Sequence, residues 1–382
     1  MYFLDMYSPS LETLLKSIKQ STANPAPFKK SEDVQSGLPF KLFPSKINKK
    51  KIVVVANTDS NMRLVNSILT NLTNADKFIL YYKGPEVKSL SDSIKLIDSV
   101  NNSLGADIVY LIGLVDKLCE SPHYLLLEDQ NGLLFNNVEL INKKIDKIYV
   151  FSEFYKKILL VQGVKKPIGV LKLGLDSEPV KHGKDTRDKM ALATDAFVIV
   201  NPSNSRTDLA IKIFTKLLML YPDYPLVLLC VSNCSYAIDI YKYELMQSGL
   251  LVHDHISKLH ITEKQDYAFA VADVGLHTDS SDKIRYDFLD FIALGPIQIV
   301  PNYGFYSAYK ENTKMVEIKE THFNPNSNSL GLYYTFDCDL FVKAVQEILT
   351  TRVNGSGTTL TNSTLLPPMS SLWADELIKS LL

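Results

Sequence analysis

Short runs of β-branched and apolar residues alternate along the chain with longer segments whose apolar positions recur every three or four residues. The first run, residues 51–56, leads through a polar turn into a periodic segment at residues 62–72. Continuous apolar runs of this length are typical of strands buried in a parallel sheet, and the longer period is typical of amphipathic helices. The pattern therefore predicts an α/β fold with a mostly parallel sheet.

The alternation occurs in two series, which predict two α/β domains of similar size. The first series predicts strands at 51–56, 78–82, 107–112, 147–151 and 169–173, with helices at 62–72, 90–101 and 154–162. The second predicts strands at 196–200, 225–231, 274–277 and 297–300, with helices at 209–220, 238–248, 263–270, 288–293 and 340–350.

The two predicted domains occupy residues 51–178 and 179–366. Residues 1–50 are interrupted by prolines and form a lead-in that we expect to pack against the body. Residues 367–382 are expected to form a terminal helix that crosses back to the first domain.

Composition supports two buried cores, since 46% of the 382 residues are hydrophobic and 22% are charged. Lysine and arginine number 41 against 42 acidic residues, so the formal net charge is −1. No overall positive field therefore exists to hold nucleic acid or an anionic membrane, and any anion site must be local.

The cysteines are too few and too scattered for a disulfide framework: Cys119, Cys230, Cys234 and Cys338. The N-terminus lacks the basic start and apolar run of a signal peptide, and no apolar stretch reaches the roughly 18 residues of a membrane helix. We therefore expect a protein of the reducing cytosol with no integral membrane segment and no metal site.

Two polar loops of the second domain follow predicted strands, where ligands collect in open parallel sheets. The first, residues 201–208, carries Asn204 and the guanidinium of Arg206 and suits a pyrophosphate; the alternative is a capped loop with a solvated arginine. The second runs from His277 to Asp290, and its Asp282 and Asp290 lie eight positions apart. We place Asp290 in the first turn of the next helix, where it complements the helix dipole and can accept from ribose hydroxyls; the alternative is a plain helix start.

Three passages carry a family resemblance: residues 145–155, residues 163–176 with Gly-Val-Lys-Lys-Pro and Leu-Gly-Leu-Asp, and residues 272–300 beginning Ala-Asp-Val-Gly. In order and spacing they resemble retaining glycosyltransferases of the GT-B fold in the large family four, and most closely a subgroup common in large DNA viruses and bacteria. The resemblance covers most of the chain from about residue 51. It implies two Rossmann-like domains facing a central cleft, with the acceptor on the first and a nucleotide sugar on the second.

The resemblance also assigns roles in the first donor loop. An Arg-Lys pair binds the donor diphosphate in that family; here Arg206 matches the arginine, while Thr207 stands in place of the lysine. His277 replaces an asparagine usual in the viral-type subgroup and is expected to flank the donor site; the alternative is a histidine at a strand end.

In the second donor loop, the family's E-x7-E motif falls on Asp282 and Asp290. The first acid approaches the donor sugar and is our candidate catalytic carboxylate, and the second binds the ribose. Where the family has a Gly-Phe-Gly type loop, this chain has Lys283-Ile-Arg285, so side chains occupy what was bare backbone. Lys283 and Arg285 either supply the missing positive charge or block the pocket.

On the acceptor side, Asn57 and Arg63 follow the first strand and are expected to face the cleft. His123 is the candidate catalytic imidazole near the donor sugar, and a hydrogen-bonded structural histidine is the alternative.

These observations predict a metal-independent glycosyltransferase that transfers a sugar from a UDP- or GDP-sugar to an unknown glycan or protein acceptor with retention of configuration. The nucleotide sugar is a co-substrate, and no further cofactor is expected. Because the lysine, both glutamates and the glycine loop have changed, the alternative is a degenerate GT-B protein that binds a protein partner or a glycan without catalysis.

Overall fold

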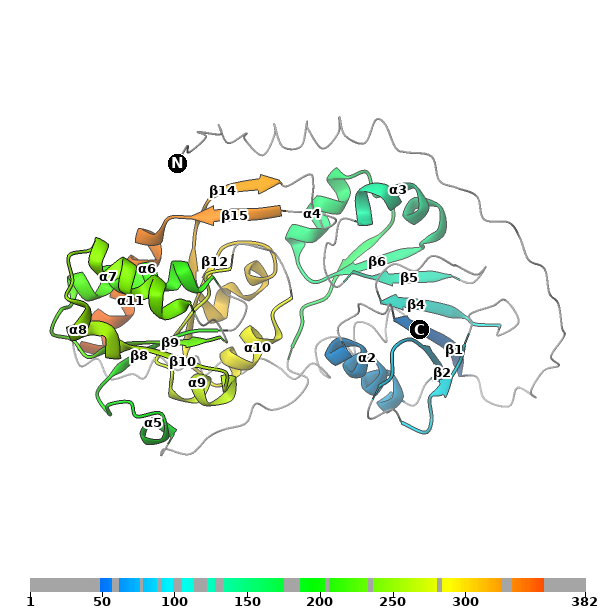
Figure 1. Ribbon diagram of the computed structural model, residues 1–382. Helices are drawn as coiled ribbons and strands as arrows, with labels where there is room; N and C mark the ends of the chain where they lie inside the picture. Colours follow the sequence, from blue (N-terminus) through cyan, green and yellow to red (C-terminus); the bar gives the residue numbers. More distant parts are fainter. Residues whose placement is uncertain are drawn as a thin grey trace. The chain divides into compact units, whose positions relative to one another are not determined.

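The computed structural model describes residues 49–56, 62–75, 78–87, 91–98, 105–112, 122–127, 133–174, 186–202, 206–232, 236–279, 284–323 and 332–353. Within these ranges the chain divides into two compact units, one of residues 49–174 with Phe323 and the other of residues 186–322 and 332–353 (Figure 1). The lead-in before residue 49 and the terminal helix at 367–382 lie outside the described residues.

The first unit is built on a seven-stranded parallel sheet with strand order β3-β2-β1-β4-β5-β6-β7. Its strands are β1 (Lys50–Ala56), β2 (Phe78–Lys83), β3 (Lys95–Leu96), β4 (Ile108–Ile112), β5 (His123–Leu126), β6 (Lys147–Val150) and β7 (Ile168–Val170). Its helices are α2 (Met62–Asn74), α3 (Leu133–Lys144) and α4 (Glu153–Val161). The central strands β1 and β4 are buried because helices of a parallel α/β unit cover both faces of the sheet.

The second unit contains a six-stranded parallel sheet with strand order β10-β9-β8-β11-β12-β13 and a two-stranded ribbon of β14 and β15. Its strands are β8 (Phe197–Asn201), β9 (Leu226–Val231), β10 (Leu259–Thr262), β11 (Val274–Leu276), β12 (Ile297–Pro301), β13 (Thr313–Val316), β14 (Ile318–Phe323) and β15 (Leu332–Phe336). Its α-helices are α5 (Thr186–Lys189), α6 (Thr207–Leu220), α7 (Ala237–Gln247), α8 (Val252–His255), α9 (Gln265–Val271), α10 (Tyr286–Ala293) and α11 (Cys338–Val353). Two 3-10 segments, η2 (Ile256–Lys258) and η3 (Tyr306–Asn312), complete it.

Strand β8 shows why an uninterrupted apolar run marks a central strand. Phe197 and Ile199 enter a core shared with α6, α7 and α11, while Val198 and Val200 enter a second core shared with α9 and α10. Successive side chains of a strand point to opposite faces, so a strand with helices on both sides must be apolar at every position.

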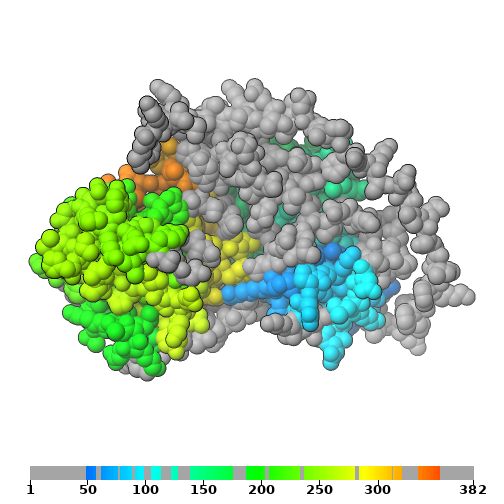
Figure 2. All heavy atoms as spheres, viewed as in Figure 1, coloured from blue at the N-terminus to red at the C-terminus, as the bar shows by residue number. Residues whose placement is uncertain are grey.

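Exposed apolar side chains of the second unit occur on and around α7: Tyr236, Tyr243, Met246 and Leu251. This part of the unit, α7 and α8, is the yellow-green surface in Figure 2. Among the described helices none combines the length and apolar character required to cross a membrane.

The predicted helix at residues 90–101 is wrong for the part that the structure describes. Residues 91–94 form a turn in which the Ile94 N–H donates to the Ser91 carbonyl at 2.9 Å, and strand β3 follows. The Ser91 hydroxyl also bonds the Ser93 hydroxyl and accepts from the Ser93 N–H. Serine side chains that bond to nearby backbone groups compete with the backbone hydrogen bonds of a helix. Here the local serine bonds form a turn, although the apolar residues are spaced as in a helix. The sequence pattern also missed α3, β5, β10, β13, β14 and β15.

Candidate functional site

The two loops predicted to bind the donor begin side by side at the carboxyl edge of the second sheet, because β8 and β11 are neighbouring parallel strands. The Asn201 side-chain amide, at the end of β8, donates to the Leu276 carbonyl at 2.9 Å and to the Thr278 hydroxyl at 3.1 Å. The Thr278 hydroxyl donates in turn to the Arg206 carbonyl at 2.8 Å. Buried side chains therefore tie the loop after β8 to the loop after β11.

Arg206 and Thr207 stand at the start of α6. Arg206 is the N-cap residue, and no side chain in the described part of the chain caps this helix end by a hydrogen bond. The first N–H groups of a helix have no partner within the helix, and the N-terminus carries the positive end of its dipole. The start of this 14-residue helix, with Thr207 in its first turn, therefore suits an anion.

The Arg206 guanidinium forms a bidentate ion pair with Asp208. Its Nε and Nη2 donate to the two carboxylate oxygens at 3.2 and 2.5 Å, and the two side chains are 48% and 44% exposed. Because exposed ion pairs contribute little free energy, a diphosphate can replace Asp208 at modest cost. The carboxylate nevertheless leaves a negative charge beside the predicted anion site.

A buried ionic network surrounds the start of α10. Arg285 Nη1 donates to Asp279 at 2.6 Å, and its Nε and Nη2 donate to the two oxygens of Asp287 at 3.1 and 3.0 Å. The Tyr306 hydroxyl donates to the other oxygen of Asp279. Burial alone would lower the pKa of Arg285, but the facing Tyr306, Asp279 and Asp287 hold it above its usual value. Arg285 is therefore a permanent cation whose charge two acids already balance, rather than an exposed replacement for the missing lysine.

His277 lies next to this network, with its Nδ1 3.5 Å from the Tyr306 hydroxyl, and has no exposed surface. Gln298 donates its amide N–H to the Pro296 carbonyl at 2.9 Å, which leaves its oxygen to accept from His277 Nε2 at 2.8 Å. The rings of Phe288 and Tyr306 lie 5.2 and 5.6 Å from the imidazole, centroid to centroid. Burial lowers the pKa of His277 to about 4, so the ring is neutral near pH 7. His277 is accordingly a core side chain at the end of β11.

Asp290 does not lie in the first turn of its helix, which corrects the prediction. Helix α10 begins at Tyr286, two residues before the predicted start, so the first-turn acid is Asp287 and the half-buried Asp290 falls in the second turn. The helix starts early because the bonds from Arg285 to Asp287 hold its first turn. The predicted site residues Asn57, Asn204, Asp282 and Lys283 lie outside the described residues.

Arg63 and His123, the two described residues that were predicted for the acceptor side, lie at opposite edges of the first sheet. Arg63 is the second residue of α2 and so lies near the carboxyl edge of the first sheet, where the helix after β1 begins. His123 is instead the first residue of β5, 2% exposed, and its N–H donates to Asp146 at 2.9 Å. Strands of a parallel sheet start at the amino edge, opposite to the edge where ligands bind. This placement argues against a catalytic role for His123.

Sequence reasoning missed Asp279, Thr278, Gln298 and Tyr306. Asp279 and Thr278 follow the end of β11 directly, which is a signal that the pattern did offer. Tyr306 carried no signal, because it meets Asp279 across 27 positions of the chain. Among the described residues no group of three or more His, Cys, Asp or Glu side chains is arranged to hold a metal ion.

Neither a protein-family model nor a curated protein matches the sequence. Solved structures do match, and three of them illustrate the likeness. HepE from Anabaena in complex with UDP and glucose has a TM-score of 0.55 at 11% identity, over 86% of this chain and 99% of that chain. A glycosyltransferase from Rickettsia africae has a TM-score of 0.57 at 12% identity, over 87% and 94%. A UDP-forming trehalose-phosphate synthase from Burkholderia xenovorans has a TM-score of 0.57 at 11% identity, over 87% and 98%.

At these identities the likeness defines the fold. The chain has the GT-B fold, built from two Rossmann-like α/β domains with parallel sheets, and the predicted fold class is confirmed.

Proposed function

We propose that the protein is a glycosyltransferase that moves a sugar from a nucleotide diphosphate donor to an acceptor with retention of configuration. One observation carries the proposal: Thr278 and Asn201 join the loops after β8 and β11 beside the start of α6, where the N-cap Arg206 side chain forms no capping bond. HepE, which has a similar fold, was solved with UDP and with UDP-glucose. A nucleoside diphosphate sugar is therefore the donor class that we propose.

The proposed mechanism depends on stabilising the leaving diphosphate while the anomeric carbon gains oxocarbenium character. Arg206 and the first N–H groups of α6 supply positive charge and hydrogen bonds to the phosphates. Asp290 accepts from the ribose hydroxyls, and Asp282 orients the donor sugar. In this scheme protein groups rather than a metal ion neutralise the diphosphate.

The charge balance near the site favours a second candidate, a degenerate GT-B protein that binds a partner without catalysis. Arg206 is paired with Asp208, and Arg285 is paired with Asp279 and Asp287, so two guanidiniums face three carboxylates. Losing one cation from a phosphate clamp costs on the order of 2–4 kcal/mol in the transition state, by analogy with an oxyanion donor. We place the enzyme first because Asn201 and Thr278 hold the two loops together at the carboxyl edge of the second sheet, the edge where ligands bind in open parallel sheets.

A matched pair of variants tests the donor site. Arg206→Ala should weaken binding of a UDP- or GDP-sugar about 10- to 100-fold, since hydrogen bonds to charged groups contribute about 1.5–3 kcal/mol. Asp208→Asn should tighten it up to about fivefold, because the competing carboxylate is lost. Isothermal titration and a donor-hydrolysis screen across nucleotide sugars measure both effects.

Both side chains are about half exposed, so neither variant should change the melting temperature by more than a degree or two. Unchanged donor affinity in both variants would show that the phosphate site lies elsewhere. Hydrolysis of no donor by the wild-type protein, despite binding, would favour the second candidate.

A further inference from the structure

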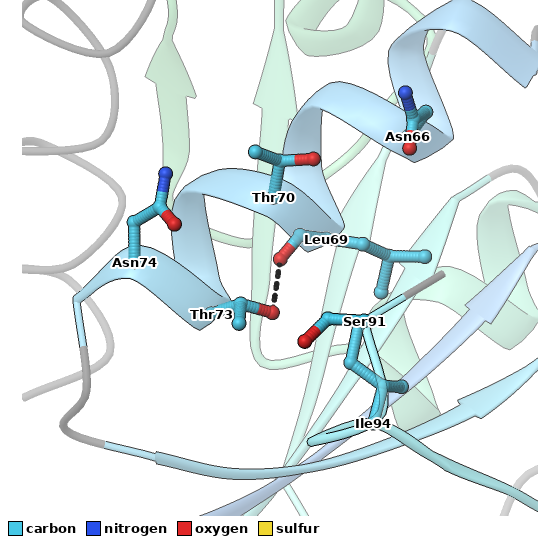
Figure 3. A pocket seen from close by; sticks show the side chains of 7 residues that line it. All are labelled: Asn66, Leu69, Thr70, Thr73, Asn74, Ser91 and Ile94. Atoms are coloured by element: carbon cyan, nitrogen blue, oxygen red, sulfur yellow. Dashed lines mark hydrogen bonds between the residues drawn. The ribbon is translucent and has the colours of Figure 1, made fainter. Parts of the chain in front are cut away.

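A small cavity in the first unit lies between α2 and the turn that precedes β3. Its volume is 170 Å³. Five of its lining side chains are polar, namely Asn66, Thr70, Thr73, Asn74 and Ser91, and two are apolar, Leu69 and Ile94 (Figure 3).

The cavity is separate from the donor site proposed above. Its turn, residues 91–94, precedes β3 and so belongs to the amino edge of the first sheet, because the strands are parallel. The proposed donor loops belong to the carboxyl edge of the second sheet. An inference about the cavity therefore does not depend on whether the donor site is correct.

The lining selects for a neutral ligand that is rich in hydroxyl groups. Among the described residues no charged side chain lines the cavity, so nothing there compensates a phosphate or a metal ion. Amide and hydroxyl side chains both donate and accept, which matches sugar hydroxyls, since these also do both. Leu69 and Ile94 also line the cavity, and because they are 1% and 7% exposed they add only a small apolar surface to a lining that is mostly polar.

Two of the hydroxyls are held in place before any ligand arrives. The Thr73 hydroxyl donates to the Leu69 carbonyl at 2.8 Å, so its oxygen lone pairs remain as acceptors. The Ser91 hydroxyl lies 2.8 Å from the Ser93 hydroxyl, and it points across the cavity toward Thr73 (Figure 3). Groups fixed in this way lose little conformational freedom when they bind a ligand.

We propose that this cavity binds one ring of a neutral sugar, either free or at the end of a glycan. The volume is below the roughly 300–1,000 Å³ of pockets for drug-sized ligands, which limits the occupant to a single ring. A ligand of this size in an open, polar cavity binds weakly, with a Kd on the order of 1–10 mM. The site would anchor a glycan on the first unit.

Saturation-transfer NMR on the full chain tests the proposal with glucose, mannose, maltotriose and glucose 6-phosphate as probes. The wild-type protein should give saturation transfer with the neutral sugars, and the phosphorylated sugar should bind no more tightly. Equal affinity for glucose and maltotriose would assign the site to a single terminal ring, and tighter maltotriose binding would extend it along a glycan.

Thr70→Val combined with Thr73→Val keeps the shape of the lining but removes two hydroxyls, and it should weaken sugar binding at least tenfold. The matched control is Thr350→Val on α11, because the Thr350 hydroxyl makes the same bond to the carbonyl four residues earlier, at 2.8 Å. The control and Arg206→Ala should both bind the sugars as the wild type does.

If the double variant fails to fold, Ser91→Trp takes its place. Ser91 is exposed, so the larger indole side chain can fill the cavity without disturbing the core. The proposal is overturned if no neutral sugar binds at several times the expected Kd. It is equally overturned if neither cavity variant weakens binding, or if glucose 6-phosphate is preferred.

Discussion

At the scale of single residues, the site is organised around a neutral histidine and paired charges in which carboxylates outnumber guanidiniums. His277 has no exposed surface, is bonded to Gln298 and lies beside the rings of Phe288 and Tyr306. In the adjoining network, Asp279 and Asp287 share the guanidinium of Arg285. A buried ion pair is stable while its partners are in place, whereas removing the Arg285 guanidinium would leave two carboxylates without their cation.

The protonation of His277 predicts how stability depends on pH. Its pKa is about 4 in the folded protein and about 6.5 when unfolded, so between these values the unfolded chain binds a proton that the folded chain does not. The free energy of unfolding should therefore fall by roughly 3 kcal/mol as the pH drops from 6.5 to 4 on account of this residue. Above pH 6.5 the contribution should be constant.

Urea unfolding of the wild type and of His277→Gln at several pH values measures this effect. The stability difference between the two proteins should shrink as the pH falls from 6.5 to 4. His255 and His260, whose pKa values burial also lowers, remain in both proteins and cancel. A difference that stays constant over this pH range would contradict a buried neutral His277.

At the scale of elements, the packing of β11, β12 and α10 depends on a glycine. Gly275 pairs with Gln298 across the sheet, and a Cβ atom at Gly275 would lie 2.0 Å from Gln298 Oε1 and 2.8 Å from Phe291 Cε1. The absent side chain therefore lets the Gln298 amide lie over β11 and reach His277, while α10 packs against the same strand. The position of the network after β11 depends on this close approach.

Gly275→Ala should lower the free energy of unfolding by about 1–3 kcal/mol, because the added methyl displaces Gln298 and overpacks Phe291. A double-mutant cycle with Gln298→Ala separates this cause from a general loss of stability. The double variant should be less destabilised than the sum of the two single variants, since removing the amide makes room for the methyl. Strict additivity would show that the clash does not involve Gln298.

At the scale of the whole molecule, the two units carry different predicted tasks. The proposed donor loops belong to the second unit, and the sugar cavity belongs to the first. A ligand stabilises the part of a protein that it contacts, so binding to each unit can be followed separately by hydrogen exchange.

A nucleotide sugar at a free concentration of 100 times its Kd should add about 2.7 kcal/mol of stability. Amides that exchange through opening of the donor site should then exchange about 100-fold more slowly. We expect this protection in β8, β11 and β12 of the second unit and not in β1 and β4 of the first. Mass spectrometry of exchanged peptides measures it, with Arg206→Ala as the control. Absence of protection with every UDP- and GDP-sugar would favour the non-catalytic candidate.

The amino-acid sequence by itself determined the α/β class and the position of the candidate loops. A strand covered on both faces must be apolar throughout, and the polar residues after β8 and β11 necessarily gather at one edge of a parallel sheet. Only the tertiary structure decided that Arg285 is neutralised by Asp279 and Asp287, and that His123 starts a strand. The physical reason is that burial and charge pairing depend on which segments meet in space: Tyr306 in η3, which follows β12 in the chain, bonds to Asp279 after β11, and no local pattern records that contact.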